Sequence, residues 1–394
     1  MVIALVLSLS ACGKAAPTTK TAPTVENLND YLQPMLDQFH LPALAALVIS
    51  DGNIVAQAAV GVRKYGDTTP ITIDDQWLLG ACTQGMTATV IAMLVEQGKL
   101  NWTTTMADIY PELKDQMLPK YHDVTILELL SHHAGLAGPG NPPDVGYPPG
   151  TTPDYWYGLT EPITQQRYEY TKDFLCQPDS PEVDSMPAPG TTYLYSNAGY
   201  VIAGAVAEQV TGKSWETLMT TMLFQPLGMT TAGFGIMGAD NQVDQPWMHS
   251  YADNQITPIS PEDVLQLEGL APVLWPAGGV HMSLKDWAKF IMINLEGEQG
   301  GSTLLKPATF KILHTPPFDT GAGFALGWAV QASPWTDGMI LLQAGSINVN
   351  YIMVCMVPGS DLAVLVTTNI GPPEAGSSCS GVIESLIAKF LPSK

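Results

Sequence analysis

Apolar residues recur at helical spacing in one stretch near residue 90, and they predict a buried helix there. Met86, Val90 and Leu94 lie on one face of that helix and form a continuous apolar stripe. Gly98 follows the last turn, where a residue in the left-handed conformation commonly ends a helix. The predicted helix therefore runs from about residue 81 to about residue 97.

The apolar pattern of the two chain ends predicts strands, whereas the middle predicts mainly helices. Leu44–Ser50 and Asn53–Val62 predict two strands joined by a tight turn at Asp51-Gly52. Residues 137–190 are rich in Pro, Gly and aromatics and predict a long loop, either a functional cover or binding wall or a packed surface excursion. Residues 230–275 predict mostly irregular chain. Further strands are predicted at 326–331, 339–343, 351–357 and 362–368, and further helices at 25–40, 124–133, from 197 through 210 with Gly212 as cap, 215–223, 286–295 and 382–390.

Strands at both ends with helices between them predict one sheet in which the early strands pair with the late ones. The predicted fold class is α/β of the α+β type, an antiparallel sheet flanked by helices with a helical insertion. We expect one domain over residues 25–392. Its sheet subdomain comprises residues 25–70 and 280–392, and its helical subdomain residues 71–279.

The first residues predict a processing signal. Val2–Leu9 is an apolar run too short to span a bilayer, and Leu9-Ser10-Ala11-Cys12 resembles a bacterial lipobox in which Cys12 is lipidated. A positive segment before the run is missing, and the alternative is an ordinary apolar N-terminus. We expect residues 1–12 to be a lipoprotein signal peptide, residues 13–24 a linker, and the protein an exported periplasmic or cell-surface lipoprotein held to a membrane through Cys12.

Charge and composition narrow the classes of partner. The 394 residues include 16 basic and 37 acidic ones, a formal net charge of −21, and 46% are hydrophobic. This balance argues against nucleic acid or an anionic membrane surface as partner. No motif implies a metal ion or another cofactor, and the pairing of the four remaining cysteines cannot be deduced. They are Cys82, Cys176, Cys355 and Cys379.

The start of the predicted helix near residue 81 suits acyl-transfer chemistry, because unpaired N–H groups there stabilise an anion. A Ser with a Lys three residues later would place both side chains on one face, and the Lys could take the Ser proton. This stretch has Ala81 and Gln84 at those positions, and no Lys in the chain has a Ser three residues before it. The stretch resembles the Ser-x-x-Lys device of β-lactamases and penicillin-binding proteins with its chemistry removed.

Five segments in order resemble the serine β-lactamase and penicillin-recognising family, on its class C and esterase-like side. The resemblance covers roughly residues 27–390 and implies a β-lactamase/transpeptidase-like fold. The segments are the helix start at Ala81, Leu129–Leu136, Pro189-Gly190 with Tyr195–Tyr200, Pro276–Gly279, and Gly327-Trp328 followed by Gln343–Ser346.

Each site residue of the family can be assigned to a position in this sequence. The nucleophile position is Ala81, which has no nucleophilic atom, and the paired Lys position is Gln84, which cannot act as a base near neutral pH. The Tyr-x-Asn motif is intact as Tyr195 and Asn197. The resemblance implies that this Tyr assists proton transfer and that this Asn contacts the acyl amide of the substrate.

The third motif of the family, Lys-Thr-Gly or His-x-Gly, corresponds to Gln343-Ala344-Gly345, so its cationic or proton-carrying residue is also replaced. The resemblance places substrate contacts at Gln343, Gly345 and Ser346. It also implies that an oxyanion would be held by the backbone N–H of Ala81 and by one N–H from the strand after Gly345. Backbone donors survive the loss of side chains.

Structural interpretations compete with these roles. Tyr195 could be a packed aromatic and Asn197 an N-cap. His132 and His133 lie in a turn that the family uses structurally. Cys82 and Thr83 could replace the nucleophile, but one and two residues along a helix rotate a side chain by about 100° and 200° away from Ala81. Trp156 and Tyr157 could hold a ligand or could pack in a core or lid.

Three functional hypotheses follow. The first is a catalytically impaired protein of the serine-hydrolase fold, a pseudoenzyme that binds a small-molecule or peptide ligand or a protein partner in the cleft. The second is an active esterase, amidase, carboxypeptidase or β-lactamase relative that uses Tyr195 or a displaced nucleophile. The third is a structural envelope lipoprotein with a collapsed cleft. Turnover that depends on Tyr195 would separate the second from the first.

Overall fold

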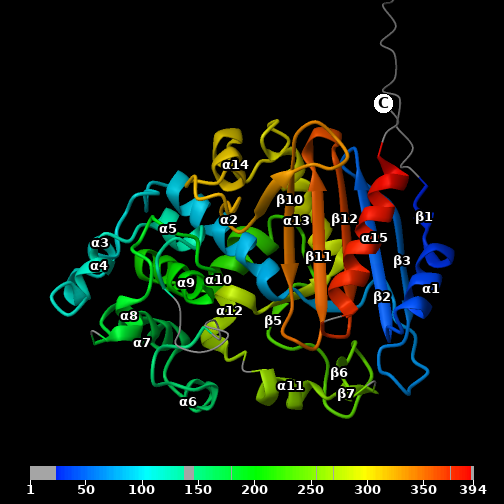
Figure 1. Cartoon of the computed structure of the whole chain (residues 1–394), viewed down its shortest axis with the longest axis horizontal. Helices are drawn as coiled ribbons and strands as arrows, with labels where there is room; N and C mark the ends of the chain where they lie inside the picture. Colours follow the sequence, from blue (N-terminus) through cyan, green and yellow to red (C-terminus); the bar gives the residue numbers. More distant parts are fainter. Residues whose placement is uncertain are drawn as a thin grey trace, which may run out of the picture.

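The computed structural model shows a sheet packed beside a helical region, with α2 (Thr83–Glu96) running between them (Figure 1). The predicted signal peptide, Cys12 and nearly all of the predicted linker lie outside the described residues. In the described part of the chain, no helix is both long enough and apolar enough to cross a membrane. The described residues are 24–136, 146–178, 180–253, 255–268, 270–372 and 374–391.

The main sheet joins the two ends of the chain, as the sequence predicts. Its strand order is β1-β3-β2-β12-β11-β10-β9, and every pair is antiparallel except β1 with β3. Val48 lies opposite Val364 in the β2–β12 pair. The strands are β1 (Glu26–Asn27), β2 (Ala43–Ser50), β3 (Asn53–Gly61), β9 (Ala329–Ala332), β10 (Met339–Gly345), β11 (Tyr351–Val357) and β12 (Leu362–Thr368).

Strand β2 is buried on both faces, so its sequence is continuously apolar rather than alternating. Leu44 and Val48 belong to a core shared with two helices on one face, whereas Ala45 and Leu47 belong to the larger core on the other. Figure 1 shows one helix in front of the sheet and one behind it. Helices α1 (Asn29–Gln38) and α15 (Glu374–Phe390) cover the first face, and α13 (Leu284–Gly297) covers the second.

Several predictions for the helical region are wrong. The stretch expected to be one long loop contains α6 (Pro153–Tyr157), α7 (Ile163–Leu175) and α8 (Pro181–Asp184). The buried face of α7 includes polar side chains such as Arg167 and Thr171, so it produces no clear apolar period. The stretch expected to be irregular contains β5 (Gly233–Phe234), β6 (Met248–Ala252), β7 (Gln255–Ile259), α11 (Pro261–Glu268), η4 (Pro272–Leu274) and the beginning of α12 (Trp275–Gly278).

Other boundaries differ for local reasons. The first helix begins at Asn29 rather than Val25, because residues 26–27 pair with β3. The helix predicted over 124–133 is only α5 (Ile126–Leu130), and His132 beyond it has a left-handed φ of 60°.

The remaining elements are β4 (Gln76–Leu78), η1 (Gly80–Cys82), α3 (Met106–Ile109), η2 (Pro111–Leu113), α4 (Pro119–His122), α9 (Asn197–Thr211), α10 (Trp215–Leu218), the π-helical turn η3 (Met219–Phe224), β8 (Val280–Ser283), the unpredicted α14 (Pro307–His314) and η5 (Pro358–Ser360).

The turn before α2 lies against the end of β10, and glycine makes this approach possible. A Cβ on Gly345 would lie 1.9 Å from the Leu79 carbonyl oxygen, and one on Gly80 would lie 2.7 Å from the Ser346 backbone nitrogen. Gly80 also has a φ of 51°, which glycine adopts without the usual strain. The helical region is therefore joined to the sheet by a backbone contact that admits no side chain.

We predict that Gly345→Ala lowers the free energy of unfolding by at least about 2 kcal/mol, because the added methyl group overlaps a backbone carbonyl that cannot move freely. Urea unfolding followed by tryptophan fluorescence measures the change. Gly359→Ala is the matched control, since a Cβ there meets no atom within 4 Å. Equal stability of the two variants would contradict the packing role of Gly345.

Candidate active site

The start of α2 brings Ala81 and Gln84 to the same side of the helical region as the Tyr-x-Asn segment. Ala81 lies in η1 and is partly exposed, whereas Gln84 is 2% exposed. Gln84 Nε2 donates a hydrogen bond to the Tyr195 hydroxyl at 2.8 Å and another to Asn197 Oδ1 at 3.2 Å. The Tyr195 hydroxyl donates to Asn197 Oδ1 at 3.3 Å. Three of the predicted site residues, all uncharged, are therefore hydrogen-bonded to one another.

Helix capping fixes the Tyr-x-Asn segment. Ser196 is the N-cap of α9, and its hydroxyl accepts a hydrogen bond from the Gly199 backbone N–H at 3.2 Å. Gly212 ends the helix with a φ of 68°, as predicted. Gly199 also lets α9 approach α5 closely, because a Cβ there would lie 2.9 Å from the Leu129 carbonyl oxygen. The flanking residues Tyr195 and Asn197 are held at the entrance of α9, and Asn197 is not the cap.

His132 supports the same segment from the turn after α5. Its Nδ1 accepts a hydrogen bond from the Ser196 backbone N–H at 3.0 Å, and its ring lies 4.4 Å from the Tyr195 ring centroid. The side chain is 1% exposed, and burial lowers the pKa of His132 to about 3. A histidine that accepts this bond must be neutral at Nδ1, so His132 positions the motif rather than carrying protons at neutral pH.

His133 has a separate structural role. Its Nδ1 bonds the Ser131 carbonyl at 2.8 Å, and its Nε2 bonds the Thr320 hydroxyl at 3.1 Å. The ring packs against Phe318 at 4.6 Å between centroids. These bonds agree with the structural interpretation of the turn, and they attach it to the chain that follows α14.

The third motif contributes backbone rather than side chains to the site. Gln343 is 6% exposed and donates from Nε2 to the Gly327 carbonyl at 2.8 Å, beneath Gly85 of α2. The Ser346 hydroxyl donates to the Asn350 carbonyl at 2.6 Å and accepts from the Asn348 backbone N–H. The Gln343 side chain and the Ser346 hydroxyl are therefore both engaged in packing and turn contacts.

The backbone nitrogens of Ala81 and Ser346 lie in the two segments that come together at this junction. The Cβ position on Gly345 lies 3.0 Å from the Ala81 nitrogen, and the Cβ position on Gly80 lies 2.7 Å from the Ser346 nitrogen. Two N–H groups from adjoining segments are the usual construction of an oxyanion site. The backbone nitrogen of Ala81 and the chain directly after Gly345, where the resemblance implies the two donors, therefore lie at the same junction.

The replacement nucleophiles considered from the sequence are buried. Cys82 is 0% exposed, and burial raises the pKa of its thiol, which disfavours the reactive thiolate. The Thr83 hydroxyl accepts a hydrogen bond from the Val280 backbone N–H at 3.2 Å and is also 0% exposed. All four cysteines in the described chain are free thiols. Within the described ranges, no group of three or more His, Cys, Asp or Glu could hold a metal ion.

The segment 137–190, which was expected to form a loop, reaches the site at Gly146. A Cβ on Gly146 would lie 3.0 Å from Asn197 Cβ, so this part of the chain lies directly against the Tyr-x-Asn motif. Trp156 is 1% exposed and donates from Nε1 to the Thr151 hydroxyl at 3.0 Å. Trp156 thus packs in the core, whereas the backbone near Gly146 contributes to the site wall.

Sequence reasoning alone did not identify the positioning role of His132 or the site contact of Gly146. Both contacts join residues far apart in the chain, and neither has a local pattern. His132 has a left-handed φ, but this conformation is visible only in the fold and not in the sequence.

Comparison with known proteins finds similar proteins over most of the chain. A family model described as Beta-lactamase matches residues 28–384. The chain is similar to penicillin-binding protein 4 of Amycolatopsis lactamdurans, with 25% identity over 360 residues that cover 85% of this chain and 82% of that protein. It is also similar to an unguisins hydrolase of Aspergillus campestris, with 23% identity covering 88% of this chain and 62% of that protein, so it spans less than two thirds of that relative. The octameric penicillin-binding protein homologue from Pyrococcus abyssi has the same fold, with a TM-score of 0.69, 20% identity, and coverage of 92% of this chain and 77% of that one.

We predict that the stability cost of His132→Asn shrinks as the pH falls. The folded-state pKa of about 3 lies below the ordinary value of 6.5, so at intermediate pH the unfolded wild type binds a proton that the folded protein excludes. The wild type therefore loses stability as pH falls through 6.5, by about 1.4 kcal/mol per pH unit for one proton. Asn keeps an acceptor for Ser196 and tolerates the left-handed backbone.

Urea unfolding of both proteins at pH 7, 6 and 5 measures the difference between their free energies of unfolding. All other titrating groups are common to the two proteins, so their contributions cancel in this difference. A difference that stays constant across this range would show that His132 does not exclude a proton in the folded state.

Proposed function

The chain belongs to the β-lactamase family, and from that premise we propose that it is a binding protein which has lost the family's acylation chemistry. In this proposal the cleft at Ala81 and Tyr195 receives a peptide, β-lactam-like or ester ligand, or a segment of a partner protein. The observation that carries the proposal is the hydrogen bond from Gln84 Nε2 to the Tyr195 hydroxyl at 2.8 Å.

Acylation requires a nucleophile, a base to take its proton, and charge that helps the proton leave. The methyl group of Ala81 cannot attack a carbonyl. Gln84 contacts Tyr195 and Asn197, but its amide can neither accept a proton near neutral pH nor stabilise a phenolate by charge. Removing either the nucleophile or its base from a comparable hydrolase costs up to about a millionfold in turnover.

The same residues favour binding over chemistry. The Tyr195 hydroxyl accepts from one neutral amide and donates to another, so its proton is engaged in a bond within the network. The backbone N–H groups of Ala81 and Ser346 remain suited to hold a ligand carbonyl oxygen. The name of one relative, a penicillin-binding protein, supports a ligand with a lactam carbonyl.

The proposal also concerns where the protein is located in the cell. Leu9-Ser10-Ala11-Cys12 has the order of a lipobox, and we propose that the protein is exported and attached to a membrane through a lipid on Cys12. Its cleft would then meet ligands outside the cytoplasm. Mass spectrometry of the protein purified from its native membrane would detect the lipid at Cys12, and an unmodified Met1 would exclude it.

We predict that the purified protein hydrolyses a short-chain nitrophenyl ester no faster than buffer, and that Tyr195→Phe behaves identically. The physical reason is the absence of a nucleophile and a base at Ala81 and Gln84. Release of nitrophenolate is followed by its absorbance. Turnover well above buffer that disappears in Tyr195→Phe would establish an active hydrolase and overturn the proposal.

We predict that the double substitution Ala81→Ser and Gln84→Lys restores covalent acylation. The introduced hydroxyl would attack the β-lactam carbonyl, its proton would pass to the introduced amine, and the ring C–N bond would open to leave an acyl ester with no leaving group lost. Intact-mass spectrometry should show the mass of one benzylpenicillin added to the double variant. Ala81→Ser alone is the control and should acylate far more slowly, because it lacks the base.

A folded double variant that forms no adduct would show that Ala81 and Gln84 are not the only barriers to acylation, and would count against an otherwise intact site. Folding of each variant is checked by its thermal unfolding midpoint, so a failure to acylate is distinguished from a failure to fold.

A further inference from the structure

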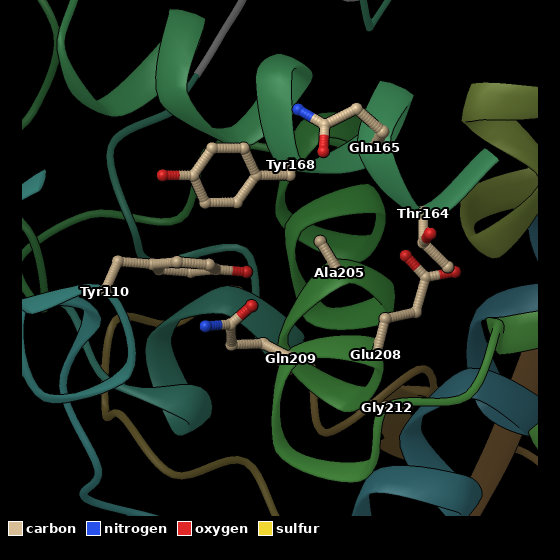
Figure 2. A pocket seen from close by; sticks show the side chains of 8 residues that line it. All are labelled: Tyr110, Thr164, Gln165, Tyr168, Ala205, Glu208, Gln209 and Gly212. Atoms are coloured by element: carbon tan, nitrogen blue, oxygen red, sulfur yellow. The ribbon is translucent and has the colours of Figure 1, made fainter. Parts of the chain in front are cut away.

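The helical region contains a cavity of about 270 Å³ between α7 and α9 (Figure 2). Glu208 on its wall accepts a hydrogen bond from Arg167 Nη1 at 2.7 Å through one carboxylate oxygen, and its other oxygen is buried. The other residues that line this cavity are uncharged. The cavity therefore offers no accessible charge to a ligand.

A second cavity, of about 550 Å³, lies beside α13 and the turn that joins β2 to β3, and we call it the α13 cavity. Its walls are residues 52–54, Asp74, residues 230–231, and Ser283 with four residues of α13. Ser283 pairs with Gln76, at the end of the β4–β8 pair that is away from the Gly80 turn. None of the lining residues belongs to the cleft at Ala81 and Tyr195.

An exposed ion pair lies in the wall of the α13 cavity. Lys285 Nζ lies 2.7 Å from Asp74 Oδ1, and the two side chains are 36% and 71% exposed. The Lys285 ammonium has three N–H donors and uses one of them in this bond, and Asp74 Oδ2 accepts no hydrogen bond within the described chain. Because exposed ion pairs contribute little to stability, both charged groups are available to a ligand.

Lys289 adds a second ammonium group, which is partly used inside the protein. Its Nζ donates to Asp286 Oδ1 at 2.6 Å and to the Gly228 carbonyl at 2.5 Å, which leaves one N–H donor. Asp286 Oδ2 accepts from the backbone N–H and the hydroxyl of Thr231, both at 2.6 Å. Burial alone would raise the pKa of Asp286, but the hydrogen bonds from Lys289 and Thr231 lower it below its usual value. Asp286 therefore stays ionised, and its charge is compensated by Lys289.

The two lysines have unfavourable positions on α13. They are four residues apart on one face, where like charges repel each other. Lys285 also lies in the first turn of the helix, whose positive end favours anions. A carboxylate placed between the two ammonium groups would relieve both costs. Positions that break such local rules are expected where a protein binds a ligand.

The α13 cavity also has an apolar side. Ile54 from β3 and Met292 from α13 both line it, and both are partly exposed. Met292 is three residues beyond Lys289, so it follows the two lysines along the same face of the helix. A ligand whose charged groups meet Lys285 and Asp74 can therefore bury an apolar group against Ile54 and Met292.

We infer that the α13 cavity binds a free α-amino acid with an apolar side chain. The ligand carboxylate would accept N–H groups from Lys285 and Lys289, and the ligand ammonium would donate to Asp74. An α-amino acid carries both charges on one carbon, as close together as the charges of Lys285 and Asp74 are. The lining holds two ammonium groups and two carboxylates, so a zwitterion adds no net charge, whereas a singly charged ligand leaves one charge unbalanced.

Calorimetric titration of the full chain at pH 7 tests this site with three ligands of similar shape. The probe is 1-aminocyclohexanecarboxylic acid, an achiral zwitterion, and its singly charged analogues are cyclohexanecarboxylate and cyclohexylammonium. We expect the zwitterion to bind at least about tenfold more tightly than either analogue. Absence of zwitterion binding up to about 10 mM, or equal affinity for one of the analogues, would overturn the inference.

Two substitutions separate the roles of the charged groups. Asp74→Asn should weaken zwitterion binding at least about fivefold and should not weaken cyclohexanecarboxylate binding, because it removes only the partner of the ligand ammonium. Lys285→Met should weaken the binding of both ligands, because it removes a partner of the carboxylate. An Asp74→Asn variant that binds the zwitterion as tightly as the wild type, or that loses both ligands equally, would contradict the assignment.

Lys172→Met is the matched control. Lys172 forms an ion pair with Glu169 at 3.3 Å, the two side chains are 39% and 41% exposed, and neither residue lines the α13 cavity. We expect this variant to change the affinity for the zwitterion by less than about twofold, and a loss equal to that of Lys285→Met would overturn the site. The thermal unfolding midpoint of each variant shows that it is folded. Failure of the amino acid site leaves the proposed loss of acylation untouched, because that loss is measured at Ala81 and Tyr195.

Discussion

The backbone contact between the turn before α2 and the end of β10 is the constraint on which the site depends. Gly345 lies so close to the Leu79 carbonyl that any side chain would overlap it. The same junction is strengthened by Asn350, which donates from Nδ2 to the Leu78 carbonyl at 2.8 Å and is 2% exposed. Because packed backbone cannot deform continuously, this contact fixes the Ala81 and Ser346 N–H groups relative to each other whatever the neighbouring side chains are.

Gln84 and Gln343 carry amides at the two positions where the family resemblance would place cations. Each amide makes a hydrogen bond within the protein. Gln84 ties α2 to the Tyr-x-Asn motif, and Gln343 ties β10 to the Gly327 carbonyl. An ammonium group would keep these sites charged and strongly hydrated, whereas the amides satisfy their neighbours without charge. The site therefore has a backbone framework held by neutral hydrogen bonds, and its electrostatics differ from those of an acyl-transfer site.

Sequence patterns located the parts of this molecule whose signals are local. Strands β2 and β3, helix α2 and the Gly212 end of α9 follow from apolar periodicity and turn residues within one segment. Helix α7 was not predicted, because its buried face carries Arg167 and Thr171 where an amphipathic helix usually has apolar residues. The family resemblance placed Gln84 and Tyr195 in one site but did not predict the hydrogen bond between them, and the support from His132 to Ser196 could not be predicted, because it joins two distant segments.

The central place of β2 also determines when the molecule can fold. Its neighbour β3 follows at once in the chain, but its other neighbour β12 is made only after the whole helical region, since Val48 pairs with Val364. During synthesis the apolar strand therefore keeps one edge unpaired until β12 has been produced. Such long-range pairing slows folding, and an exposed apolar edge invites association with other chains. The unpaired edge of β2 therefore makes the incomplete chain prone to aggregation until β12 is available to cover it.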